Sequence, residues 1–186
     1  MKTINDIISS IEFDEWMMEV LRAAQSLNLP DWWICAGFVR SKIWDTLHGI
    51  QPRTPMSDVD LIYFDSAILD EEMEKEYENQ LEQIFSDVPW SVKNQARMHL
   101  VNQIPPYASS VDAISKFPET VTALGVKLND NGQVLLSAPH GIDDVLNMEV
   151  KPTSYFLEKE ERVAIYKKRI KEKKWSLTWN NVKILY

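Results

Sequence analysis

The sequence lacks several features that would assign it to common protein classes. It has one cysteine, Cys35, so it forms no internal disulfide and offers no cysteine-based zinc site. No apolar run approaches the roughly 20 residues that a bilayer-spanning helix needs. The N-terminus also lacks the long apolar core of a signal peptide. We therefore expect a cytoplasmic protein with no membrane contact.

Basic residues are also in short supply. The chain has 20 Lys and Arg against 28 Asp and Glu, which gives a net charge of −8. Broad binding of nucleic acid needs a basic surface, so we do not expect strong general nucleic-acid binding. A small phosphorylated ligand, held by a local basic cluster and a metal ion, remains compatible with this charge. The oligomeric state is not indicated by the sequence.

The length and the apolar pattern predict one domain of mixed structure. The 186 residues suit a single domain with a core over about 30–150 and helical additions over 1–29 and 151–186. Helical spacing occurs over 13–28, 39–47, 69–85, 111–117, 141–146 and 157–174. Strand-like runs occur over 32–36, 59–64, 90–98, 121–126 and 134–136. This alternation predicts an α/β or α+β fold with helices packed on a small mixed central sheet.

An unusually acidic stretch lies within the third of these helical segments. Between Asp70 and Asp87 there are eight acidic residues and one lysine. Such a run is typical of a solvated helix face, and an acidic docking surface is the alternative.

Two carboxylates close together in an apolar run are the strongest chemical signal. Asp58 and Asp60 begin the strand-like run over 59–64. Residues i and i+2 of a strand share a face, about 6–7 Å apart at their Cα atoms. Two carboxylates at that separation repel each other, and a shared hard cation such as Mg²⁺ relieves the repulsion. The pair therefore predicts a metal site.

Upstream of the pair, Gly37 stands between a strand and a helix. A glycine there lets a phosphate approach the backbone, and the helix N-terminus offers free N–H groups and a positive dipole end. Arg40 follows in the first turn of the helix. A glycine turn for a triphosphate beside two carboxylates for Mg²⁺ is a nucleotidyl-transfer arrangement.

These motifs resemble those of a known superfamily. Residues 36–40 and 57–60 are similar to the nucleotidyltransferase superfamily related to DNA polymerase β. Longer stretches resemble a little-characterised bacterial branch of it; they are residues 36–45, 57–65, 90–99 and 117–123. The resemblance covers about residues 30–150. It implies an enzyme that uses Mg²⁺ or Mn²⁺ to transfer a nucleoside monophosphate from an NTP to an acceptor hydroxyl that the sequence does not identify. The alternative is a catalytically inactive nucleotide- or partner-binding module on the same fold, for example an antitoxin-like protein.

The resemblance also implies roles for individual residues. The metal ligands would be Asp58 and Asp60, and the nucleotide would contact Gly37, Phe38, Arg40, Lys93 and Arg97. Active members use a further carboxylate on a later strand to activate the attacking hydroxyl. The expected strand, residues 90–95, contains no acid, and Asp112 is the nearest downstream candidate. Phe38 also replaces the small residue that normally follows the glycine, and the gap to Asp58 is longer than usual.

Overall fold

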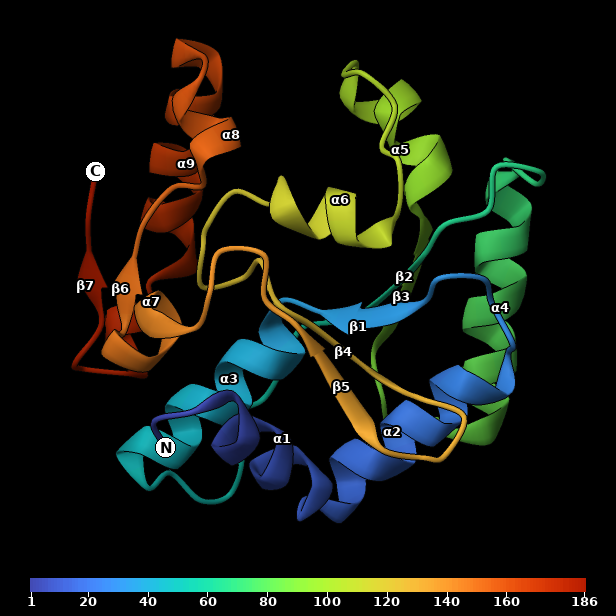
Figure 1. Ribbon diagram of the computed structural model, residues 1–186, viewed down its shortest axis with the longest axis horizontal. Helices are drawn as coiled ribbons and strands as arrows, with labels where there is room; N and C mark the ends of the chain where they lie inside the picture. Colours follow the sequence, from blue (N-terminus) through green and yellow to red (C-terminus); the bar gives the residue numbers. More distant parts are fainter.

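A computed structural model describes all residues, 1–186, and shows a five-stranded mixed sheet (Figure 1). The strands are β1 (Trp33–Cys35), β2 (Val59–Tyr63), β3 (Trp90–Asn94), β4 (Gly125–Leu128) and β5 (Val134–Ser137). Their order is β3-β2-β1-β4-β5. Only β2 and β3 are parallel; the other neighbours are antiparallel. The predicted fold class, helices around a small mixed sheet, is therefore confirmed.

Helices surround this sheet. They are α1 (Ile4–Glu12), α2 (Glu15–Ser26), α3 (Gly37–His48), α4 (Glu71–Ile84), α5 (Gln95–Asn102), α6 (Ser110–Ser115), α7 (Asp143–Asn147), α8 (Ser154–Leu157) and α9 (Glu160–Lys173). In Figure 1, α1, α2 and α3 lie on the lower side, and α5 and α8–α9 stand on either side of α6. A 3₁₀ turn (Trp175–Leu177) and a two-stranded sheet of β6 (Glu149–Val150) and β7 (Lys183–Ile184) complete the C-terminal part. None of the helices combines the length and hydrophobicity that crossing a membrane would require.

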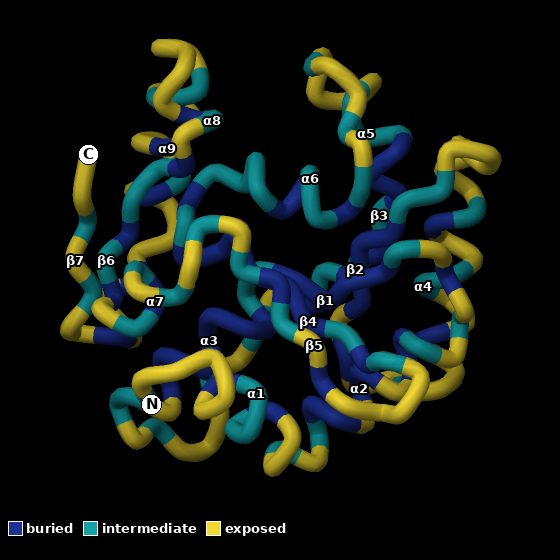
Figure 2. Tube along the Cα trace, viewed as in Figure 1, coloured by how far each residue is buried: buried dark blue, intermediate teal, exposed yellow.

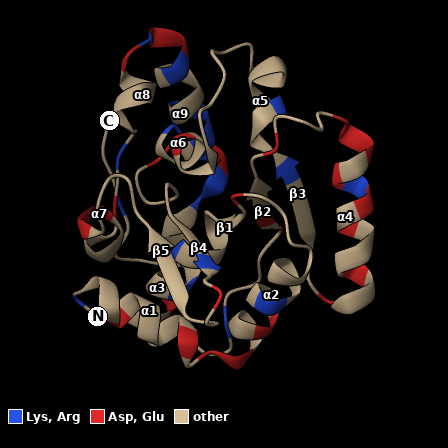
Figure 3. Ribbon diagram, turned by 45° about the vertical axis from the view of Figure 1, so that its right-hand side comes forward, with Lys and Arg blue, Asp and Glu red and all other residues tan.

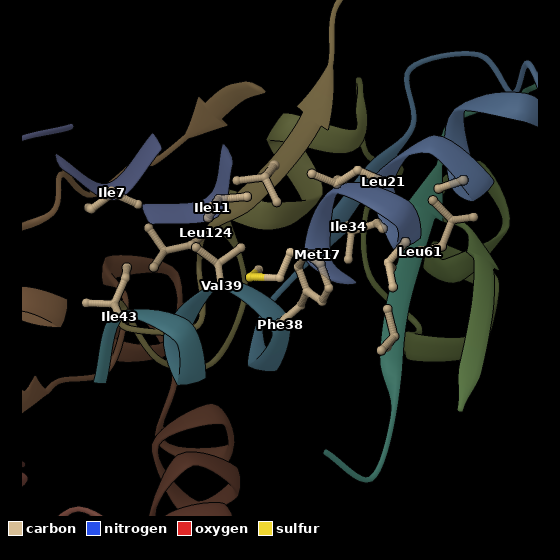
Figure 4. Packing of buried hydrophobic residues seen from close by; sticks show 14 of the residues in the cluster. Ile7, Ile11, Met17, Leu21, Ile34, Phe38, Val39, Ile43, Leu61 and Leu124 are labelled. Carbon is tan, nitrogen blue, oxygen red and sulfur yellow. The ribbon is translucent and has the colours of Figure 1, made fainter. Parts of the chain in front are cut away.

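The two faces of the sheet bury apolar groups to different extents. A cluster of 35 buried residues covers the face toward α1, α2 and α3, and it includes Ile34 of β1, Leu61 of β2 and Val39 of α3 (Figure 4). Since side chains alternate along a strand, Trp33 and Cys35 of β1 point to the opposite face, where only five buried residues cluster under α6. Figure 2 shows buried residues concentrated along the strands. The thinly covered face leaves room for a cavity.

Several predicted boundaries differ from the structure. The strand expected over 90–98 ends at Asn94, whose side chain accepts a hydrogen bond from the Ala96 N–H at 3.1 Å and so begins α5. That prediction was wrong for residues 95–98, which places Arg97 on a helix. The first hairpin strand begins at Gly125 rather than at residue 121, and the helix expected over 157–174 is α9, which begins at Glu160 after the separate short helix α8.

Two acids of the acidic stretch on α4 bind the edge of the sheet, which neither interpretation of the sequence predicted. Most of its acids are exposed, as a solvated helix face predicts. However, Glu78 accepts a hydrogen bond from the Val92 N–H at 2.7 Å, and Glu74 accepts one from the Asn94 N–H at 3.0 Å. Both N–H groups belong to β3, the edge strand of the sheet. The two carboxylates therefore occupy N–H groups of the edge strand that could otherwise pair with a strand of another chain.

Candidate functional site

The two carboxylates line the same large cavity. Asp60 belongs to β2 and Asp58 directly precedes that strand, and both line a cavity of about 970 Å³. The pKa of Asp60 is raised to about 6, first by burial and then by the charge of Asp58. Ser57 donates a hydrogen bond to Asp58 at 3.1 Å. The pair thus carries the repulsion that a bound cation would relieve.

The turn between β1 and α3 opens into the same cavity. Ala36 has a φ of +54°, a conformation that costs energy for a residue with a side chain and that clusters at functional sites. A Cβ added to Gly37 would meet only the Arg40 Nη2 atom, at 3.9 Å, so the space above this glycine is open. The N-terminus of α3, a helix of 12 residues, presents its free N–H groups there.

Arg40 is a buried cation without a carboxylate partner. Its exposed fraction is 8%, its Nη2 donates to the Ser41 Oγ at 3.0 Å, and its Nε has no hydrogen-bond partner. Its guanidinium lies 5.2, 4.7 and 5.3 Å from the ring centroids of Trp44, Trp175 and Trp179. Burial lowers the pKa of Arg40 to about 10, so the group remains charged at neutral pH. A buried, unpaired charge beside an open helix N-terminus is suited to binding an anion.

Basic side chains of α9 form the opposite wall. Arg162, Arg169 and Lys173 line the cavity from one face of this helix, and Lys159 precedes them. Figure 3 shows basic residues along α9 and acidic residues along α4, far across the sheet. The charges of Lys173 and Arg169 favour the ionised form of Asp60. Of the side chains that line the cavity, seven are Lys or Arg and three are Asp or Glu, the reverse of the balance of the whole chain.

Arg169 is held in place by a buried carboxylate. Glu119 has an exposed fraction of 0%, accepts from the Arg169 Nε at 2.9 Å, and accepts from the Thr122 hydroxyl at 2.7 Å. This ion pair joins α9 to the loop after α6, so the basic wall is fixed relative to the sheet.

The far end of the cavity, away from the carboxylates, is aromatic and basic; it consists of Tyr107, Lys116, Tyr155 and Arg162. The Arg162 guanidinium lies 3.5 Å from the ring centroid of Tyr155. The Lys116 Nζ lies 5.2 Å from the ring centroid of Tyr107 and 5.9 Å from that of Tyr155. The Tyr155 hydroxyl is buried and has no hydrogen-bond partner. This end of the cavity therefore combines aromatic rings with positive charge.

The structure brings some of the residues suggested by the sequence together. Asp58, Asp60, Gly37, Arg40 and Lys93 all line the cavity. Lys93 also lies within ion-pair distance of α4, with its Nζ 3.4 Å from a Glu74 oxygen and 3.6 Å from a Glu78 oxygen.

Three other suggested residues are directed elsewhere. Arg97 does not line the cavity and binds Glu74 through its Nε and Nη2, at 3.1 and 2.9 Å. The Phe38 side chain is 1% exposed and packs in the apolar core against Trp16 (Figure 4), so it does not crowd the phosphate turn. Asp112 lies outside the cavity and accepts hydrogen bonds from the Ala108 N–H and the Lys116 Nζ.

Sequence reasoning missed the basic wall and the tryptophans around Arg40. The spacing of Arg162, Arg169 and Lys173 places them on one helix face, and this signal is readable from the sequence. Trp175 and Trp179 gave no such signal, because their position beside Arg40 depends on how the C-terminal segment folds back over α3.

The carboxylate pair is suited to a magnesium ion that a substrate helps to hold. No group of three or more His, Cys, Asp or Glu side chains in the structure could hold a metal ion. Mg²⁺ is commonly bound by one or two carboxylates together with substrate phosphates and water. Asp58 and Asp60 supply that minimal set of hard oxygen ligands, beside a turn that is open to phosphate.

Comparisons with known proteins find the same fold in solved structures. One solved structure, described as an NMR structure that reveals a CCA-adding enzyme head domain, is 35% identical, with a TM-score of 0.90, over 100% of this chain and 97% of that one. Two other structures, described as a CCA-adding enzyme in an apo form and in complex with CTP, are each 13% identical to this chain. Their TM-scores are 0.57 and 0.53, and they show the fold alone. The match to the apo form spans 100% of this chain and 43% of the other chain. The match to the CTP complex spans 99% of this chain and 42% of the other chain.

A search among curated proteins finds no match. A family model described as nucleotidyltransferase matches residues 22–184, which include the glycine turn, the carboxylate pair and the basic wall. The chain belongs to this nucleotidyltransferase family.

Proposed function

We propose that this protein transfers a nucleoside monophosphate from an NTP in a reaction that depends on Mg²⁺ or Mn²⁺. One observation carries the proposal: Arg40, a buried and unpaired guanidinium, stands beside the open turn at Gly37, in the same cavity as Asp58 and Asp60. Arg40 and the N-terminus of α3 favour a bound anion, and Asp58 and Asp60 favour a bound cation. A metal–triphosphate complex supplies both ions at neighbouring positions.

Each element of the cavity has a definite part in this reaction. The N–H groups at the start of α3 and the Arg40 guanidinium would hold the β- and γ-phosphates. Asp58 and Asp60 would hold the metal, which neutralises charge on the phosphate oxygens when it is bound. Arg169, fixed by Glu119, faces the carboxylates from α9 and would stabilise charge that builds up on the departing pyrophosphate. The CTP bound in one structure of the same fold supports an NTP as the nucleotide donor.

Titration calorimetry with the four NTPs, with and without Mg²⁺, tests the proposal. We expect binding of at least one NTP that is strengthened by Mg²⁺. The variant Asp58→Asn should lose this metal dependence, while its circular dichroism spectrum stays unchanged. Asp130→Asn, which removes an exposed acid in a hairpin turn, is the matched control and should bind as the wild type. Equal Mg²⁺-dependent binding by Asp58→Asn would overturn the assignment.

A binding module without catalysis is the second candidate. The observation that favours it is the residue next to Asp60 on β3, which is Ser91 rather than an acid. An assay for pyrophosphate release separates the two candidates. If NTP binds but no pyrophosphate is released with any acceptor tested, the binding module is favoured. Metal-dependent release of pyrophosphate would favour the transferase.

A further inference from the structure

The side chains beside the carboxylate pair are unsuited to removing a proton. In the parallel register of β2 and β3, Ser91 lies opposite Asp60 and Lys93 lies opposite Ile62. Since side chains two apart share a face, both residues are on the cavity side of β3. In the family that the sequence resembles, an acid on this later strand activates a hydroxyl. This chain instead presents a neutral hydroxyl and a cation there.

No other lining group takes over that task. Glu161, the third lining acid, stands eight residues before Arg169, about 12 Å along α9 by the helical rise. It therefore belongs to the opposite end of the cavity from Asp60. The three histidines do not line the cavity, and each has a ring nitrogen 2.8 Å from a backbone carbonyl oxygen.

Cations remain available after the nucleotide phosphates are accounted for. Arg40, on the side of α3, is assigned to the nucleotide phosphates at the turn near Gly37. Lys173 lines the same cavity from α9, on the other side. Lys93 also lines the cavity on the β3 side, but its ammonium already lies within ion-pair distance of Glu74 and Glu78. Lys173 is therefore the lysine of the cavity wall that we assign to a second anion.

We propose that the acceptor is a phosphomonoester and that its anionic oxygen is the attacking atom; this inference rests on the proposed function. The second pKa of a phosphomonoester is about 6, so this oxygen is unprotonated at neutral pH and needs no base. It attacks the α-phosphorus and forms a new P–O bond. The bond from the α-phosphorus to the bridging oxygen breaks, and pyrophosphate leaves with the electron pair. No proton moves, and the product joins acceptor and nucleoside through a pyrophosphate linkage.

The cavity extends from the carboxylate pair to the aromatic end at Tyr107 and Tyr155. Its volume of about 970 Å³ is near the upper limit of single small-molecule sites, which span about 300–1,000 Å³. Tyr107 and Tyr155 at the far end offer aromatic rings beside Lys116. This end would contact the remainder of the acceptor, and it favours one that carries a ring.

The test uses the whole protein with its nucleotide site filled. The NTP that binds most tightly is supplied as its non-hydrolysable α,β-methylene analogue with Mg²⁺. Phenyl phosphate is then titrated as the probe, and phenol as its uncharged counterpart. We expect phenyl phosphate to bind with one equivalent and phenol not to bind. Lys173→Gln should weaken the binding of phenyl phosphate at least tenfold. Lys171→Gln removes an exposed lysine of the same helix that does not line the cavity, and it should have no effect.

Three outcomes would overturn the inference. Phenyl phosphate does not bind to the filled cavity, or Lys173→Gln binds it as the wild type does, or ³¹P NMR of a turnover mixture with alcohols shows a phosphodiester product. Failure of the proposed function is distinguishable from all three, because the NTP analogue itself would then not bind. Binding of the analogue without binding of phenyl phosphate rejects only the phosphomonoester acceptor.

Discussion

The Arg40 guanidinium lies 4.7 Å from the ring centroid of Trp175, so the C-terminal segment covers the first turn of α3. Trp179 strengthens this attachment, since its indole N–H donates to an Asp45 carboxylate oxygen at 2.9 Å. Cation–π contacts of a desolvated guanidinium stabilise by about 2 kcal/mol. The tail after α9 therefore lines the end of the cavity where we propose that phosphate binds.

This attachment predicts a large effect at Trp175. We expect Trp175→Ala to lower the free energy of unfolding by about 3–5 kcal/mol, as is usual for removing a buried tryptophan. It should also weaken NTP binding, because Arg40 loses one of the rings that hold it. Urea denaturation and calorimetry measure the two effects. Leu177→Ala, at a side chain that is 82% exposed, is the control and should change stability by less than about 0.5 kcal/mol.

A substitution at Gly37 tests whether the turn between β1 and α3 binds phosphate, and it should leave the fold intact. A Cβ at Gly37 would lie 3.9 Å from its nearest neighbour, so we expect Gly37→Ala to unfold near the wild-type urea concentration. The added methyl group would occupy the approach to the backbone and should weaken NTP binding about tenfold or more, a change of about 1.4 kcal/mol.

Gly125 provides the opposite case for comparison. A Cβ there would lie 2.9 Å from the Ile114 Cδ1 and 3.2 Å from the Cys35 Sγ. Gly125→Ala should therefore cost about 1–3 kcal/mol of stability by overpacking.

A Gly37→Ala protein that binds NTP with unchanged affinity would contradict the assigned phosphate position.

Glu74 is expected to be the most sensitive acid of α4. It is fully buried and accepts hydrogen bonds from the Asn94 N–H and from Arg97. Replacing it by alanine leaves a partly buried arginine and a strand N–H without partners, so we expect a loss of about 3–5 kcal/mol in the free energy of unfolding. Denaturation of Glu74→Ala measures this. Glu72→Ala removes an exposed acid whose ion pair with Lys75 is solvated, and it should cost less than about 1 kcal/mol. Equal losses in the two variants would refute the role in sealing the sheet edge.

The metal-free protein should lose stability as the pH rises through 6. The folded-state pKa of Asp60 is about 6, raised above its ordinary value of 3.8 by burial and by Asp58. Its protonated form is thus favoured by folding, and this contribution is complete below pH 3.8 and lost above pH 6. Asp60→Asn should then be more stable than the wild type at pH 8, by on the order of 2 kcal/mol, and equally stable below pH 4. Thermal denaturation in the presence of a chelator measures both. A difference that does not vary with pH would contradict the raised pKa.

Local signals predicted the parts of the molecule that depend on near neighbours in the chain. A run rich in β-branched and aromatic residues identified β2, and Asp58 and Asp60 line one cavity, as their spacing suggested. Gly37 marked the start of α3 because a glycine between a strand and a helix is a local feature. The parts that failed depend on distant contacts or on a competing cap. Asn94 ended β3 early and carried Arg97 away from the cavity, and Arg169 gained its place only through Glu119, 50 residues away.

The tail that covers Arg40 has a practical consequence for experiments on this protein. A purification tag attached after Tyr186 would lie close to β7, which pairs with β6. An expression boundary chosen at the end of α9 would remove Trp175 and Trp179 together. A shortened protein of this kind would expose the guanidinium to water, and we expect it to bind NTP more weakly than residues 1–186 do. Assays should therefore keep residues 174–186, with any tag placed at the N-terminus.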